Sequence, residues 1–172
     1  RQRQMCIRDR GPLEKKYRRL AEKLPNPIVM EFYEPARLLE ILHMADLYVH
    51  TSDAEIEAMS CMEAFACGLV PVIADSPRSA TPQFALDERS LFQAGSSDDL
   101  AAKIDYWLSE PAERARMEAA YSEHGKNFAL DGCVRQMEQM FEEELRDFHR
   151  ENRRIENCRK FTEEGKSRDG VV

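Results

Sequence analysis

Two short apolar runs with one helix-length segment between them constrain the fold more than any other feature of this sequence. Residues 45–50 and 70–74 are rich in Val, Leu and Ile, and each run ends at a polar loop. The segment between them predicts a helix over 57–67, ended by Gly68, because glycine suits the left-handed conformation that closes many helices. Two strands joined through a helix form the repeating unit of a parallel sheet.

The rest of the first 130 residues continues this alternation. Further helices are predicted at 12–24, 35–44, 97–108 and 113–128, and further strands at 28–32 and 91–92. The fold class is therefore α/β, with a Rossmann-like parallel sheet flanked by helices. Ligands of such sheets bind beyond the carboxyl ends of the strands, so the loops after Val49 and Ala74 are expected to carry the chemistry.

Three segments are predicted after residue 10. Residues 11–130 form the sheet domain, 131–160 form one long helix, and 161–172 form a disordered tail. The apolar stripe of the long helix comprises Val134, Met137, Met140, Phe141, Leu145 and Phe148. Because a small domain cannot bury so long a stripe, we expect part of it to pack against something outside this chain.

The first ten residues do not fit either periodicity. They contain four arginines, and residues 5–10 resemble the translation of a transposon-end sequencing adapter. We expect residues 1–10 to be adapter-derived or disordered and the protein to continue upstream. A basic N-terminal arm is the alternative.

Charge and cysteine content exclude several classes of protein. The formal net charge of −7 argues against sequence-independent nucleic-acid binding, which needs a basic face. No signal peptide opens the chain, and no run of 18 apolar residues occurs. The five cysteines and four histidines show no metal-ligand spacing, so no metal site is expected. Reduced thiols indicate a cytoplasmic protein.

The most informative stretch runs from Ser52 to Ile73. It contains Glu55 and, eight residues later, Glu63 followed by Ala, then a small residue before Gly68 and a Pro-Val-Ile strand. This pattern resembles the Glu-x7-Glu element of the C-terminal domain of GT-B-fold retaining glycosyltransferases of the large family four. The resemblance extends from about residue 11 to the long last helix.

The resemblance implies a role for each residue of this element. Glu63 would hold the ribose of a nucleotide-sugar donor, and Glu55, the catalytic candidate, would hold the hydroxyls of the transferred sugar. The backbone amides near Ala58, Met59 and Ser60 would lie against the diphosphate. Family members have glycines after the first Glu, whereas this chain has Ile56 and Ala58, which puts the approach of the diphosphate in question.

Physical reasoning supports this interpretation independently. Eight residues span just over two helical turns, so the two carboxylates are expected on one side of the helix. A helix N-terminus offers free amides to a diphosphate. Glu63 lies among apolar neighbours, where an unpaired carboxylate is costly, whereas Glu57 is interpreted as a solvated charge.

The loop after the next strand supplies further candidates. Ser76, Arg78 and Ser79 are predicted loop contacts of the donor, although an exposed loop arginine is more often solvated. His50 ends its strand at the edge of the site, and a lone histidine there is more often a packing or capping residue. Trp107 is interpreted as core.

These observations predict a glycosyltransferase fragment that binds a UDP-hexose for retaining transfer to a lipid or saccharide, without a cofactor or metal. The resemblance implies a missing N-terminal acceptor domain as partner and an inactive chain on its own. Resemblance to glycolipid-forming bacterial members adds peripheral contact with the inner membrane surface. A noncatalytic nucleotide-binding scaffold and a GT-B nucleotide-sugar epimerase are the alternatives.

Overall fold

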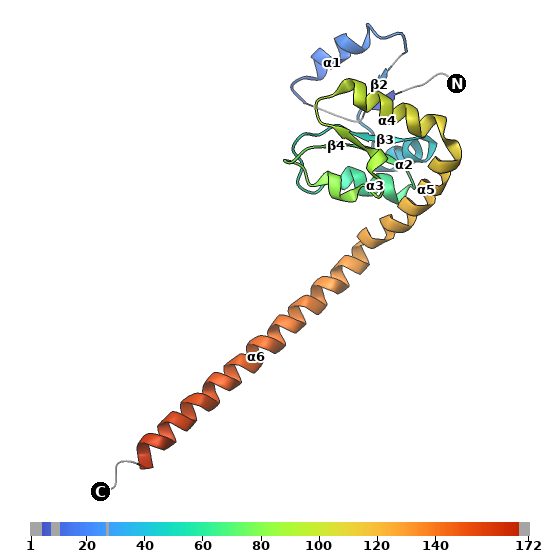
Figure 1. The fold of residues 1–172 in the computed structure, drawn as a ribbon. Helices are drawn as coiled ribbons and strands as arrows, with labels where there is room; N and C mark the ends of the chain where they lie inside the picture. Colours follow the sequence, from blue (N-terminus) through green and yellow to red (C-terminus); the bar gives the residue numbers. More distant parts are fainter. Residues whose placement is uncertain (1–4, 8–10, 27, 169–172) are drawn as a thin grey trace. The chain divides into compact units, whose positions relative to one another are not determined.

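The computed structural model describes the backbone of residues 5–7, 11–26 and 28–168, and the side chains of residues 11–26 and 28–155. The chain divides into two compact units, Arg1–Glu123 and His124–Val172. The first unit contains the strands and most of the helices, and the second consists of a short 3-10 helix and one long α-helix (Figure 1).

The centre of the first unit is a three-stranded parallel sheet. Its strands are β3 (Tyr48–His50), β4 (Pro71–Asp75) and β5 (Leu91–Gln93), in the order β3-β4-β5. In the register of the sheet, Ile73 of β4 lies opposite His50 on one side and Leu91 on the other. The predicted α/β class with a parallel sheet is confirmed.

Helices cover this sheet on both faces. The helices of the first unit are α1 (Glu14–Ala21), α2 (Pro35–Met44), α3 (Met59–Ala66), α4 (Ser97–Ser109) and α5 (Pro111–Gly125), with 3-10 turns η1 (Thr81–Phe84) and η2 (Glu88–Ser90). Helix α3 contacts β3 and β4, and α4 contacts β4 and β5. Figure 1 shows α3 and α4 on opposite sides of the sheet.

The core forms between the sheet and the helices α3, α4 and α5. Phe65, Trp107 and Tyr121 have no exposed surface, which confirms Trp107 as core. The Phe65 and Tyr121 rings stack with centroids 5.1 Å apart. Gly68 ends α3 in a left-handed conformation with φ 75°, and a Cβ there would meet the Glu118 carbonyl oxygen at 3.4 Å. Both the conformation and the close approach favour glycine.

A second, smaller parallel pair joins β1 (Met5–Ile7) to β2 (Ile28–Met30), with Cys6 opposite Val29. Strand β1 falls within the first ten residues, for which no regular structure was predicted. Three residues are too few to show strand alternation in the sequence, so the pairing could not be inferred from it. Residues 1–4 and 8–10 of that segment lie outside the described residues.

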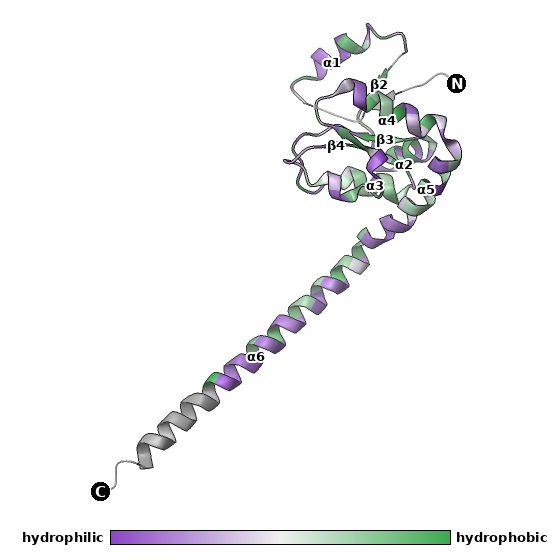
Figure 2. Cartoon of the chain, viewed as in Figure 1, coloured by the Kyte–Doolittle hydropathy of each residue, from purple (hydrophilic) through white to green (hydrophobic). Residues whose placement is uncertain are grey.

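The second unit contains η3 (Lys126–Phe128) and α6 (Leu130–Arg168). Helix α6 extends eight residues past the predicted end at 160; the added residues 161–168 contain one glycine, Gly165, and no proline. Figure 2 shows hydrophobic residues recurring along α6 between hydrophilic ones. The stripe side chains from Val134 to Phe148 are exposed by 44–61%. Among the described helices, none is both long and apolar enough to cross a bilayer.

Candidate functional site

The loop between β3 and α3 does not follow the predicted helix boundary. Helix α3 begins at Met59, two residues later than predicted, because Ala58 adopts the left-handed conformation with φ 49° and ψ 51°. Glu55 therefore lies four residues ahead of the helix. Glu63 is thus within α3, whereas Glu55 belongs to the loop ahead of it.

The Glu55 carboxylate turns back onto the loop that carries it. Its Oε1 accepts a hydrogen bond from the Ile56 amide at 3.0 Å. Backbone amides, that of Ala58 most strongly and then that of Ile56, hold the pKa of Glu55 below its usual value. Glu55 forms no ion pair with any described residue. An anionic oxygen group therefore already lies against these amides, without a cation to neutralise it.

A second loop, which follows β4, is tied to the Glu55 loop by backbone contacts. Ala80 donates its amide hydrogen to the Glu55 carbonyl at 2.9 Å, and Glu55 pairs with Ser79 in an isolated parallel bridge. The Ser79 hydroxyl itself hydrogen-bonds Thr81. The predicted residues of both loops thus lie at the carboxyl end of the sheet, as expected.

Asp53 joins the same two loops through side chains. The buried Ser76 hydroxyl lies 2.7 Å from both the Asp53 carbonyl oxygen and its Oδ1, and Arg78 forms an ion pair with the Asp53 carboxylate. Sequence reasoning named Ser76 and Arg78 but not Asp53. Its position one residue after Ser52 in a polar loop gave no signal to separate it from a solvated aspartate.

A polar cluster links the end of β3 to the start of α3. The Tyr48 hydroxyl donates to Ser60 Oγ at 2.8 Å and lies 3.0 Å from His50 Nδ1. Tyr48 and His50 stand two residues apart on β3 and share one face of the strand. That spacing was the available signal for the cluster, which sequence reasoning missed because His50 was considered alone.

Glu63 lies on the second turn of α3 and is half-buried rather than enclosed. Cys61, Ala64 and Phe65 are fully buried, so these three apolar neighbours of Glu63 in sequence are part of the core while Glu63 itself is not. A helix places adjacent residues about 100° apart, which is why sequence neighbours are a poor guide to burial. Glu63 is therefore more open to solvent than its apolar sequence neighbours suggested.

The remaining candidates lie on the exposed side of this element. Ile56 and Met59 are exposed by 85% and 64%, and Ser60 is also exposed. The described residues contain no group of three or more His, Cys, Asp or Glu that could hold a metal ion.

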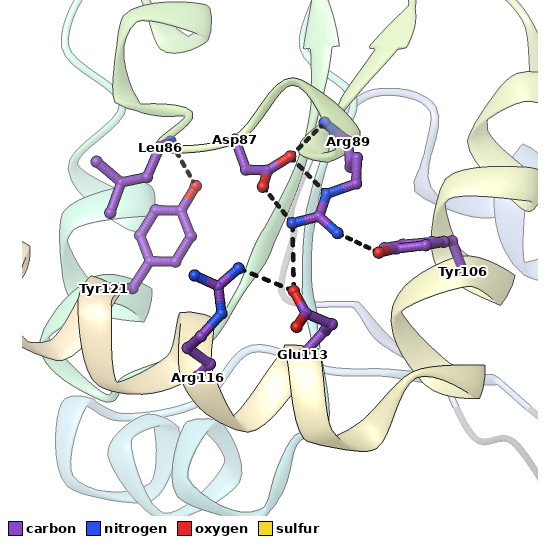
Figure 3. A network of polar contacts seen from close by, with 7 residues as sticks. All are labelled: Leu86, Asp87, Arg89, Tyr106, Glu113, Arg116 and Tyr121. Atoms are coloured by element: carbon purple, nitrogen blue, oxygen red, sulfur yellow. Dashed lines mark hydrogen bonds and ion pairs between the residues drawn. The ribbon is translucent and has the colours of Figure 1, made fainter.

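A separate polar network ties the loop ahead of β5 to α4 and α5 (Figure 3). Arg89 donates from Nε to Asp87 Oδ1 at 2.8 Å, hydrogen-bonds the Tyr106 hydroxyl and lies 3.5 Å from Glu113. Its guanidinium also lies 5.2 Å from the ring centroids of Tyr106 and Trp107. The Arg89 guanidinium thus combines ion pairs, a hydrogen bond and ring contacts, which is typical of a structural cluster.

The family model described as Glycosyl transferases group 1 matches residues 1–124, almost three quarters of the sequence. The chain belongs to this family. A search of curated protein sequences returned no significant match.

Among solved structures, this group 1 glycosyl transferase is similar to the catalytic domain of cholesterol-alpha-glucosyltransferase from Helicobacter pylori. The two share 48% sequence identity with a TM-score of 0.70, over 73% of this chain and 79% of the other. The GT-B resemblance inferred from the Glu-x7-Glu element is thereby confirmed at the level of family and fold.

Proposed function

We propose that this group 1 glycosyl transferase domain binds a nucleotide-sugar donor at the carboxyl end of its sheet. The observation that carries the proposal is the convergence of the Ile56 and Ala58 amides on the Glu55 carboxylate. A loop that binds one anionic oxygen group through backbone amides has the geometry to bind another. The diphosphate of the donor is that second anion.

Donor binding is then an exchange of anions. The diphosphate takes the place of the Glu55 carboxylate on the amides, and the displaced carboxylate becomes available to the hydroxyls of the transferred sugar. Carboxylates accept such hydrogen bonds well because they are charged acceptors. Glu63, half-buried on α3, is proposed to hold the ribose, and Ser76, Arg78 and Ser79 to flank the donor.

The finer assignment follows the similar structure and the sequence resemblance. We propose a UDP-hexose as donor, retaining transfer, and a lipid or saccharide as acceptor, with peripheral contact at the inner membrane surface and the acceptor site on a further domain. Glucose is the first sugar to test, because the similar structure is a glucosyltransferase. Backbone amides meet the diphosphate charge, so no resident metal is proposed.

Calorimetric titration of the 172-residue chain with UDP-glucose tests the proposal. We expect binding, and we expect Glu63→Gln to weaken it about tenfold, the typical loss of a hydrogen bond to a charged group. Glu57→Gln is the matched control, since Glu57 is an exposed carboxylate two residues ahead of α3, and the affinity of this variant is expected to stay within twofold of the unaltered chain. Absence of binding at millimolar UDP-glucose would refute the proposal.

The same titration distinguishes a noncatalytic nucleotide-binding scaffold from the two enzymes considered, a glycosyltransferase and a nucleotide-sugar epimerase. A noncatalytic scaffold predicts no selectivity between UDP-glucose and UDP, because nothing would hold the sugar. The proposed donor site predicts that the sugar changes the affinity and that the change depends on Glu55.

A further inference from the structure

His50 is a buried polar group that the proposed donor contacts do not use. It ends β3, is only 8% exposed, and its Nδ1 lies 3.0 Å from the Tyr48 hydroxyl. Its other ring nitrogen, Nε2, has no hydrogen-bond partner among the described residues and is closed to solvent. A buried ring nitrogen without a partner is costly, so its retention needs an explanation.

The protonation of the ring follows from its neighbour. Tyr48 has one hydroxyl proton, which it donates to Ser60 Oγ at 2.8 Å, so Tyr48 can only accept from His50. His50 Nδ1 therefore carries a hydrogen. Burial lowers the pKa of His50 and keeps the ring neutral near pH 7, opposed by the nearby Glu55 carboxylate. The neutral ring has only one hydrogen, so Nε2 is a hydrogen-bond acceptor.

Two acceptors therefore lie close together at the end of β3. Glu55 lies in the loop that follows β3, five residues after His50, and its carboxylate opposes the fall in the pKa of His50. The carboxylate oxygens and the Nε2 atom of His50 are all hydrogen-bond acceptors. A ligand that satisfies both must present two neighbouring donors. Adjacent hydroxyl groups on a sugar ring have this arrangement, whereas a phosphate, which only accepts at neutral pH, does not.

We propose that His50 Nε2 accepts a hydrogen bond from a hydroxyl of the transferred sugar, beside the Glu55 carboxylate, so that the pair recognises two adjacent hydroxyls. The inference rests on the proposed function and adds a specificity-determining residue to it. Because Nε2 is closed to solvent, the sugar reaches it only after neighbouring groups move. When the Glu55 carboxylate leaves the backbone amides for the sugar hydroxyls, a group next to the His50 ring moves.

The first test is nitrogen NMR of the histidine rings in the 172-residue chain. We expect the Nε2 of His50 to resonate as an unprotonated nitrogen and Nδ1 as a protonated one. Addition of UDP-glucose should shift Nε2 toward the protonated range, and addition of UDP should not. A hydrogen on Nε2 in the free protein would overturn the inference, since that nitrogen could not accept.

The second test uses calorimetry with substituted chains. His50→Phe is expected to weaken UDP-glucose binding about tenfold while UDP binding stays within twofold, and His50→Gln, which keeps an acceptor, should restore part of the loss. His43→Phe is the control, because His43 is exposed on α2 and bonds only the Leu39 carbonyl at 2.7 Å. If the substituted chains fail to fold, UDP-glucose analogues lacking single hydroxyls replace them on the unaltered chain.

The outcomes distinguish the two proposals. If UDP-glucose binds but neither His50→Phe nor removal of any sugar hydroxyl weakens it, the inference is wrong and the proposed function stands. If the unaltered chain binds neither UDP-glucose nor UDP, the proposed function is wrong and the inference is wrong with it.

Discussion

Two acidic side chains of the first compact unit cover backbone amides, and they do so in opposite ways. Asp87 accepts from the Arg89 amide at 2.9 Å while its carboxylate is paired with the guanidinium of the same residue. Glu55 accepts from the Ile56 amide at 3.0 Å and forms no ion pair with a described residue. The first carboxylate is neutralised where it lies. The second is held only by amides that another anion can use.

The pKa values of the two groups have different physical causes. The main cause that holds the pKa of Asp87 below its usual value is the hydrogen bond from the Arg89 side chain. For Glu55, the main causes are the hydrogen bonds from the Ala58 and Ile56 amides. A hydrogen bond to a neighbouring guanidinium fixes a carboxylate to one partner. Hydrogen bonds to a loop of amides leave the site open to exchange, which is why the same local chemistry is structural in one place and proposed as functional in the other.

The largest expected effect is on the structural side. Arg89→Leu removes the partner of Asp87 and Glu113 and the cation over Tyr106 and Trp107, so the midpoint of thermal unfolding is expected to fall by about 5 °C. Arg116→Leu, which removes an exposed partner of the same Glu113, should lower it by less than about 1 °C. Equal shifts in a scanning calorimeter would contradict a structural role centred on Arg89.

On the functional side, Glu55→Ala removes the competing anion. Binding of UDP is expected to become about fivefold tighter, the scale of one backbone-capping side chain, while UDP-glucose gains less because its sugar loses a contact. Glu57→Ala removes the same charge from the same loop and should change UDP affinity by less than about twofold. Calorimetry that finds UDP binding unchanged or weaker in Glu55→Ala would break the comparison.

Acid titration distinguishes the two carboxylates directly. The contribution of Asp87 to stability is complete above its ordinary pKa of 3.8 and is lost as pH falls through its lower value in the folded chain. Arg89→Leu should raise the pKa of Asp87 and leave that of Glu55 unchanged. Carbon NMR of the side-chain carboxyl groups measures both, and a parallel rise of the two would show that they are coupled.

The smallest expected effect concerns the loop backbone. Ala58 has φ 49°, which is strained for any residue with a Cβ, so Ala58→Gly is expected to stabilise the fold by about 0.5 kcal/mol. Ala66→Gly, at the last position of α3, should destabilise it by about 0.5–1 kcal/mol, because glycine has more freedom to lose there. Urea unfolding of both variants checks the opposite signs.

The sequence predicted much of this fold because its signals are local. Helix α2 was predicted at its observed bounds, Pro35 to Met44, and β4 and α4 were predicted within one residue. The start of α3 was predicted two residues too early, because an alanine in the sequence gives no sign of a left-handed conformation. That conformation belongs to the folded loop, in which the Ala58 and Ile56 amides also face the Glu55 carboxylate.

The candidate site was predictable in place but not in arrangement. The Glu-x7-Glu spacing located Glu55 and Glu63, and the strand ends located Ser76 and Arg78. Asp53 and the contact of Tyr48 with His50 depend on loops that meet only after folding. Burial of Glu63 was misjudged because sequence neighbours on a helix face different directions.

Amide NMR of the 172-residue chain titrated with UDP tests the central claim most directly. If the diphosphate exchanges with the Glu55 carboxylate, the amide resonances of Ile56 and Ala58 should shift in a saturable way, and those of Arg89 and its neighbours should not. UDP binding that leaves the Ile56 and Ala58 amides unmoved, or no binding at millimolar UDP, would contradict the account.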